Sequence, residues 1–259
     1  MDLRALRQRL DAERRGLARR GEVVEILPLL TRIRRDTLQE ISFSQLTPTD
    51  ADSAIAEQIQ HYRRLEAAVE WKVYAHDTPV DLLQRLAAQG FTIGPAEAVL
   101  VLDLGDPPSW VFDEGAPVVR VRTERHVSMF RDAAEEIFGK DYGWTAGQLR
   151  EGIAAGSNEH LGYVAVEGER AVSIGRLYTH PDSHFGGLYG GGTRASHRGR
   201  GFYRAVVAAR ARDAIELGAC SLIIDALPTS QPILRRLGFA QLSETWPCTW
   251  KPEVRGSGS

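Results

Sequence analysis

The sequence contains few cysteines and little net charge. Cys220 and Cys248 are the only two cysteines in 259 residues, and they form neither a C-x-x-C pair nor a Cys/His spacing typical of zinc. We therefore expect no disulfide scaffold, no bound metal and a reducing, cytoplasmic compartment. The formal net charge is −2, which argues against binding of nucleic acid through an overall positive charge.

Long apolar runs are also missing. No stretch approaches 18 uncharged apolar residues, so the sequence predicts no membrane-spanning helix. Residues 1–20 are rich in charge and lack the uncharged core of a signal peptide. Leu3, Leu6 and Leu10 recur there at helical spacing, which fits a helix lying on a membrane or one docked on the protein. Because acidic residues are mixed with the basic ones, we expect the docked helix and no membrane partner.

What the chain does contain is a globular composition. Apolar residues make up 43% of it, enough for a packed core. Strand patterns and helix patterns both recur along the chain, so the sequence indicates a protein that contains helices and strands. The periodicity stops in the Gly-, Pro- and Asp-rich residues 105–117, which predict a linker. On both sides of it, a strand, a proline-containing turn and a helix end in Gly-Phe, at Phe91 and at Phe239. This echo indicates two related domains; the alternative is two unrelated units that share a C-capping glycine.

The most informative motif is "RASHRGRGFYRAVV", which begins at Arg194. A strand pattern precedes it and an amphipathic helix pattern follows. Glycines at the start of a helix let the backbone approach an anion, and the unpaired N–H groups of the first turn then point at that anion. The stretch lacks the GKS/GKT of a P-loop and the G-x-G-x-x-G spacing, and it is too short for an RGG-type segment. It predicts a phosphate or pyrophosphate site; the alternative is a helix start with a surface basic cluster.

The same stretch resembles the pyrophosphate loop of the GNAT family of N-acetyltransferases, Gln/Arg-x-x-Gly-x-Gly/Ala. Arg198 takes the first place and Gly201 the fourth, whereas Tyr203 stands where Gly or Ala is usual. The order of elements over residues 118–250 and the ending "ILRRLGF" resemble the family as well. The resemblance implies an α+β fold with a mixed, predominantly antiparallel central sheet flanked by helices, and acetyl-CoA as cosubstrate. It implies that the pyrophosphate binds to the amides of Arg198, Gly199, Arg200, Gly201, Phe202 and Tyr203, and the pantetheine arm to Gly192, Thr193 and Arg194.

The resemblance also implies a division of the chain into domains. The first half is similar to the later part of the same fold but has no counterpart of the glycine loop, so it resembles a degenerate GNAT-like domain. The expected divisions are residues 1–104 for this domain, 105–117 for the linker, 118–252 for the acetyltransferase domain and 253–259 for an appended tail.

The usual catalytic residues of the family are not at their places. The strand before the loop, "GGLYGGGTRAS", carries no carboxylate, and Leu234 stands where the family has a tyrosine. Acetyl transfer needs a base for the amine and a proton donor for the thiolate. Asp225 is a candidate base, with turn capping as its alternative role. Ser230 and Tyr189 are candidate proton donors, with helix capping and core packing as their alternatives.

The remaining polar residues are consistent with more than one role. Glu135, Glu136, Asp141 and Tyr142 fit recognition of a cationic amine and fit simple solvation equally well. His180, His184 and His197 show no metal-ligand spacing and are expected in solvated loops. We expect an N-acetyltransferase that acts on a small amine and binds no nucleic acid; homodimerisation is left open. The alternative is a non-catalytic acyl-CoA-binding or protein-interaction module.

Overall fold

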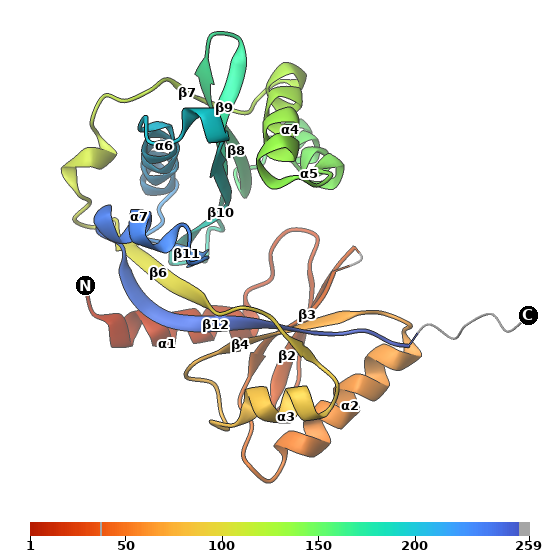
Figure 1. The fold of residues 1–259 in the computed structure, drawn as a ribbon. Coiled ribbons are helices and arrows are strands. Elements are labelled where there is room, and N and C mark those ends of the chain that lie inside the picture. Colours follow the sequence, from red (N-terminus) through yellow and green to blue (C-terminus); the bar gives the residue numbers. More distant parts are fainter. Residues whose placement is uncertain (37, 254–259) are drawn as a thin grey trace, which may run out of the picture. The chain divides into compact units, whose positions relative to one another are not determined.

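The computed structural model describes residues 1–36 and 38–253 (Figure 1). These residues form two compact units. Unit 1 comprises Met1–Leu100, Asp225–Leu234 and the chain from Gln241 onward, and unit 2 comprises Val101–Ile224 and Arg235–Ala240. Of the tail expected at 253–259, only Glu253 lies within the described residues.

Unit 1 is built on a sheet whose strands follow the order β1-β2-β3-β4-β12. The pairs are antiparallel except for β3 and β4, which are parallel. Its elements are α1 (Leu3–Gly16), β1 (Val23–Ile26), β2 (Leu30–Arg35), β3 (Leu38–Ser44), α2 (Ala51–Arg64), β4 (Val69–Tyr74), α3 (Leu82–Ala88), β5 (Thr92–Ile93) and β12 (Ala240–Trp250). Strand β12 contributes Ala240 to unit 2, and three more elements also contribute residues to both units: β6 (Glu97–Asp103), β11 (Ser221–Ala226) and α7 (Gln231–Arg236).

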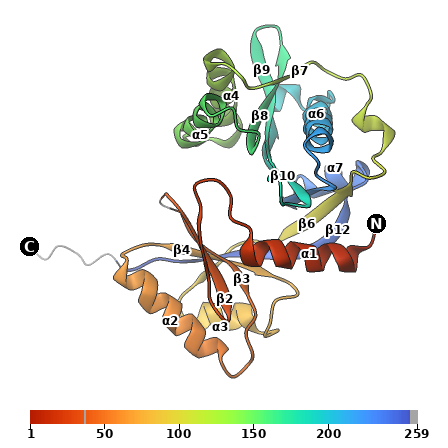
Figure 2. The ribbon, with the colours of Figure 1, turned by 180° about the vertical axis from the view of Figure 1, so that it is seen from behind.

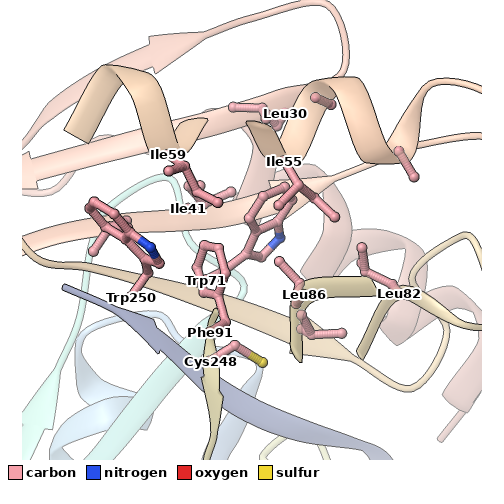
Figure 3. Packing of buried hydrophobic residues seen from close by; sticks show 14 of the residues in the cluster. Leu30, Ile41, Ile55, Ile59, Trp71, Leu82, Leu86, Phe91, Cys248 and Trp250 are labelled. Atoms are coloured by element: carbon pink, nitrogen blue, oxygen red, sulfur yellow. The ribbon is translucent and has the colours of Figure 1, made fainter. Parts of the chain in front are cut away.

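The core of unit 1 lies between its sheet and the helices α2 and α3 (Figure 3). Alternation along β4 sends Trp71 and Val73 into this core and leaves Lys72 on the opposite face of the sheet. The Trp71 indole meets the ring of Phe91 edge to face, with centroids 6.1 Å apart. The helix expected at the N-terminus is docked, as predicted from its leucines, with Leu6 and Leu10 buried.

Unit 2 contains a second sheet segment, in the order β11-β10-β9-β8-β7. Only β10 and β11 are parallel. Its remaining elements are the 3-10 helix η1 (Ser109–Val111), β7 (Val118–Arg120), α4 (Glu124–Phe138), α5 (Gly143–Ala154), β8 (His160–Glu167), β9 (Arg170–Tyr178), β10 (Phe185–Thr193), the 3-10 helix η2 (Ala195–His197) and α6 (Phe202–Glu216). Helices α4 and α5 cover one face of this sheet and α6 covers the other (Figures 1 and 2).

The predicted fold class is confirmed: helices flank a predominantly antiparallel sheet. The compact units divide the chain differently from the expected domains, which remain a prediction. β12, expected in the second domain, pairs with β4 of unit 1 from Thr245 to Trp250. The expected linker packs on unit 2, because Val111 is buried and its carbonyl accepts a hydrogen bond from Arg212 at 2.5 Å. A Gly- and Pro-rich composition predicts irregular backbone but says nothing of whether that backbone is packed.

Candidate functional site

The loop between β10 and α6 has the backbone of an anion site. Gly199 and Gly201 adopt φ values of +73° and +84°, in the left-handed region that favours glycine. Gly201 is the N-cap residue of α6, and within the described chain no side chain caps this helix end. The first N–H groups of a helix have no intrahelical acceptor. The start of α6 therefore presents free donors and the positive end of a helix dipole.

The arginines around this loop differ in their partners. Arg194 pairs with Glu136, Arg200 pairs with Glu167, and Arg204 bonds Asp113 at 2.5 Å. Arg198 is exposed, and its Nε donates only to the Thr193 carbonyl, at 3.3 Å. It has no carboxylate partner in residues 1–36 and 38–253. Most of the positive charge is thus neutralised, and the uncompensated part lies on the residue that holds the first place of the motif.

Of the predicted pantetheine-binding residues, Gly192 and Thr193 end strand β10, and Arg194 follows it. The Gly192 carbonyl accepts a hydrogen bond from the Ser173 hydroxyl at 2.9 Å, and the hydroxyls of Ser173 and Thr193 lie 2.8 Å apart. Arg194 is only 5% exposed and donates from Nε to the Ala171 carbonyl at 2.7 Å. These side chains hold the end of β10 against β9. A role in binding pantetheine would therefore fall to their backbone, and it remains a prediction.

Tyr203, which departs from the family pattern, packs against strand β10. Its ring occupies the space beside Gly191, where an added Cβ would lie 3.1 Å from the ring. Behind it lies Arg210, which is fully buried. Burial lowers the pKa of Arg210, and the nearby hydroxyls of Tyr203 and Tyr163 counteract part of this shift. The Tyr203 ring therefore points toward strand β10, and the neighbouring Phe202 is buried. This leaves the N–H end of the helix open.

Tyr189 lies in β10 just before the strand loses its regular register with β9, between Tyr189 and Gly192. Its ring meets Tyr178 edge to face with centroids 5.0 Å apart. The side chain is partly exposed, and within the described chain its hydroxyl has no hydrogen-bond partner. A hydroxyl of this kind is available to donate a proton or to orient a substrate.

The other two candidate catalytic residues already have partners in unit 1. The Asp225 carboxylate forms an ion pair with Lys72, and both side chains are largely buried. The Ser230 hydroxyl donates to the Leu227 carbonyl at 3.2 Å, just before α7 begins. To act on a substrate, the Asp225 carboxylate would have to leave its ion pair with Lys72.

Sequence reasoning missed the acidic groups around Lys72, the partner of Asp225. Burial raises the pKa of Glu97, and the negative charge of Asp225 raises it further, while Lys72 lowers it. Burial likewise raises the pKa of Glu40, again against the effect of Lys72. Glu70 lies opposite Glu40 in the parallel pair of β3 and β4. The alternation in "EWKVYA" places Glu70 and Lys72 on one face of their strand, but no sequence signal connects them to Asp225.

The acidic residues considered for amine recognition are already paired. Glu135 bonds Arg131 at 2.7 Å and accepts from the Tyr142 amide at 3.2 Å. Asp141 also binds Arg131, at 3.2 Å. Glu136 belongs to Arg194. Since arginines compensate these carboxylates, solvation and structure account for them without a cationic ligand.

The histidines of the sequence analysis do not gather around a metal position. His197 lies 3.1 Å from the Glu167 carboxylate. Within the described chain, the group with metal-like spacing consists of Asp11, His76 and Asp77. The guanidinium of Arg14 donates to both carboxylates of this group, at 2.7 Å and 2.8 Å. An internal cation therefore already occupies the position between them.

Unit 2 also contains a cavity of about 240 Å³. Leu149, Ile153 and Leu161 form part of its apolar wall, and Arg120, Arg122 and His160 part of its polar wall. None of the residues predicted from the sequence lines it.

Comparison with known proteins identifies the fold family of the chain. No protein-family model matches the chain, and no curated protein matches it. Solved structures do match it. A GCN5-related N-acetyltransferase from Kribbella flavida has a TM-score of 0.68 and 16% identity over 98% of this chain and 96% of that one. A GCN5-related N-acetyltransferase from Sphaerobacter thermophilus has a TM-score of 0.57 and 13% identity, covering 91% of this chain and 85% of the other.

A tandem GNAT protein from the clavulanic acid biosynthesis pathway also matches, with a TM-score of 0.56 and 13% identity over 86% of this chain and 78% of that chain. The chain therefore has the GNAT fold, as the loop motif indicated. At these identities the likeness establishes the fold alone. In the described part of the chain no helix combines the length and apolarity needed to cross a membrane.

Proposed function

We propose that the protein is an acetyl-CoA-dependent N-acetyltransferase that acts on a primary amine of a small molecule. The observation that carries the proposal is the start of α6 in a GNAT fold. There a left-handed Gly201, an open helix N-terminus and the uncompensated charge of Arg198 come together. Each of these features favours a bound diphosphate.

The chemistry of the loop fits the tail of coenzyme A. The amides of Arg198–Tyr203 are the proposed donors to the pyrophosphate, and the Arg198 guanidinium adds a planar, charged donor. The backbone of Gly192–Arg194 is the proposed partner of the pantetheine arm. Binding the long cosubstrate at these places would hold its thioester beside the acceptor and convert a bimolecular attack into a positioned one.

In the proposed reaction the amine nitrogen forms a bond to the acetyl carbon, and the carbon–sulfur bond breaks with its electron pair on sulfur. The nitrogen loses one proton and the thiolate gains one. Tyr189 is the best supported of the three candidates, because its hydroxyl has no partner within the described chain. Asp225 would have to act from its ion pair with Lys72, and Ser230 from its bond to Leu227.

Those two engaged residues favour the second candidate function, a module that binds acyl-CoA without turnover. Calorimetric titration with acetyl-CoA, combined with a free-thiol assay over a panel of amines, separates the two. Transfer to an amine supports the enzyme. Tight binding with no thiol release above the spontaneous rate supports the module, and no binding refutes both.

Single replacements then test the candidate residues. We expect Tyr189→Phe to lower kcat with little change in the affinity for acetyl-CoA. Asp225→Asn and Ser230→Ala are assayed in parallel, and unchanged turnover in any variant removes that residue from the mechanism. Lys72→Met is the matched companion of Asp225→Asn: it should raise turnover if freeing Asp225 creates a better base.

A further inference from the structure

Arg176 of unit 2, like Arg198, forms no ion pair in residues 1–36 and 38–253. It lies on β9 directly opposite Tyr189 of β10 in the antiparallel register. Its side chain is half-buried, and its Nε lies 3.2 Å from where a Cβ of Gly190 would stand. Opposite residues of an antiparallel pair have Cα atoms about 4.5–5.5 Å apart and point to the same face. Arg176 and Tyr189 are therefore neighbours on one face of the sheet.

In residues 1–36 and 38–253 the Arg176 side chain has a hydroxyl and an amide group nearby, and no carboxylate bonds to it. Its Nη1 donates to the Tyr178 hydroxyl at 3.4 Å, and that hydroxyl donates to Gln148 of α5 at 3.4 Å. Its buried Nε has no hydrogen-bond partner in residues 1–36 and 38–253, and no ion pair to Arg176 is formed there. A further cation, Arg210, donates from the other side of the sheet to the Arg176 carbonyl, at 3.2 Å.

Two other largely buried arginines have carboxylate partners, whereas the fully buried Arg210 donates to the carbonyls of Val206 and Arg176. Arg14 is paired with Asp77, and Arg194 with Glu136. Leaving a half-buried guanidinium without an anion costs stability, and an anionic ligand bound to it would remove that cost. The planar fork of arginine matches the two oxygens of a carboxylate or phosphate.

We propose that the acceptor amine carries an anionic group, a carboxylate or a phosphate, which Arg176 binds. The inference rests on the proposed function, because it places the anion beside Tyr189, next to the expected position of the thioester. It narrows the substrate class to amines whose acidic group lies close to the nitrogen, as in amino acids and aminoalkyl phosphates. Arg176 is then the residue that determines specificity, and the hydroxyl of Tyr178 helps to orient it.

Matched acceptor pairs test this assignment. Amino acids are compared with the corresponding decarboxylated amines, and O-phosphoethanolamine with ethanolamine, by thiol release from acetyl-CoA. A charged hydrogen bond contributes about 1.5–3 kcal/mol, so the wild type should prefer the anionic member of at least one pair by about tenfold or more in kcat/KM. The carboxylate and phosphate pairs show which group is preferred.

Variants of Arg176 test whether this side chain causes the preference for anionic acceptors. Arg176→Gln should abolish the preference by raising the KM for the anionic acceptor, while the affinity for acetyl-CoA stays unchanged. Arg176→Lys should keep part of it, because lysine retains the charge but loses the fork. Arg125→Gln, at a position 72% exposed in the same unit, is the control and should match the wild type.

Three results would overturn the inference. The wild type could favour the neutral amines, or Arg176→Gln could retain the preference. The third is a preference for succinyl-CoA over acetyl-CoA that Arg176→Gln removes, which would assign the anion to the acyl donor.

If acetyl-CoA binds but no amine is acetylated, the proposed function fails and the anion site is tested alone. N-acetylated amino acids and N-acetyl-O-phosphoethanolamine should then raise the melting temperature of the wild type but not of Arg176→Gln. No rise in the wild type refutes the anion site.

Discussion

Replacement of Arg198 tests most directly whether the loop between β10 and α6 binds a diphosphate. Arg198 and Arg200 flank Gly199, are both exposed and belong to the same motif. They differ in that Glu167 neutralises Arg200, whereas Arg198 has no carboxylate partner in the described part of the chain. If the loop binds one diphosphate, Arg198→Gln should weaken acetyl-CoA binding far more than Arg200→Gln does.

The magnitude follows from the type of contact. A hydrogen bond to a charged group contributes about 1.5–3 kcal/mol, and exposure of Arg198 to solvent favours the lower end of this range. We therefore expect Arg198→Gln to raise the Kd for acetyl-CoA by about tenfold. An exposed ion pair contributes about 0–1 kcal/mol, so Arg200→Gln should change the Kd by less than about threefold.

Isothermal titration at low and high salt measures both effects. The dependence of Kd on salt should be smaller in Arg198→Gln than in the wild type, because one charge facing the phosphates is gone. Equal weakening by the two variants would refute the reasoning, since it would mean that the loop acts as a diffuse basic patch. An unchanged Kd in Arg198→Gln would refute the placement of the diphosphate.

Three further predictions concern backbone, stability and pH. Gly201→Val should abolish acetyl-CoA binding in titration, while its circular dichroism spectrum stays native. A non-glycine residue at φ +84° costs about 1–2 kcal/mol, and the valine side chain would lie where the anion approaches the loop. Full affinity in this variant would contradict the prediction. Arg14→Met should lower the free energy of unfolding in urea by about 3 kcal/mol or more, because it leaves Asp77 buried without its partner, and adding Asp77→Asn should recover part of the loss. Glu97 has a pKa raised by burial and by Asp225, so its contribution to stability is present below the unfolded-state pKa and is lost as pH rises through the folded-state pKa. Glu97→Gln should therefore gain more in melting temperature over the wild type at pH 8 than at pH 4.5, and a pH-independent gain would argue against the raised pKa.

The backbone of the glycine loop could be predicted from the sequence because its causes are local. Glycines two residues apart before an amphipathic helix predict positive φ values and a free helix N-terminus, and both are present at Gly199 and Gly201. The periodicity of the apolar residues likewise predicted which segments are strands and which are helices, since it depends only on neighbouring residues. The α+β class followed from the resemblance of the motifs to a known family. The docking of α1 through Leu6 and Leu10 follows from the same local periodicity.

The roles of individual charges depended on tertiary contacts. Glu167 lies 33 residues from Arg200, Asp113 lies 91 residues from Arg204, and Lys72 lies 153 residues from Asp225. No local pattern reveals such pairs, because each arises where separate strands and helices pack together. The sequence alone therefore showed that a basic, glycine-containing loop precedes a helix. Folding determined that Arg198 and Arg176 keep uncompensated charges, since a charge is neutralised by whatever the rest of the chain places beside it.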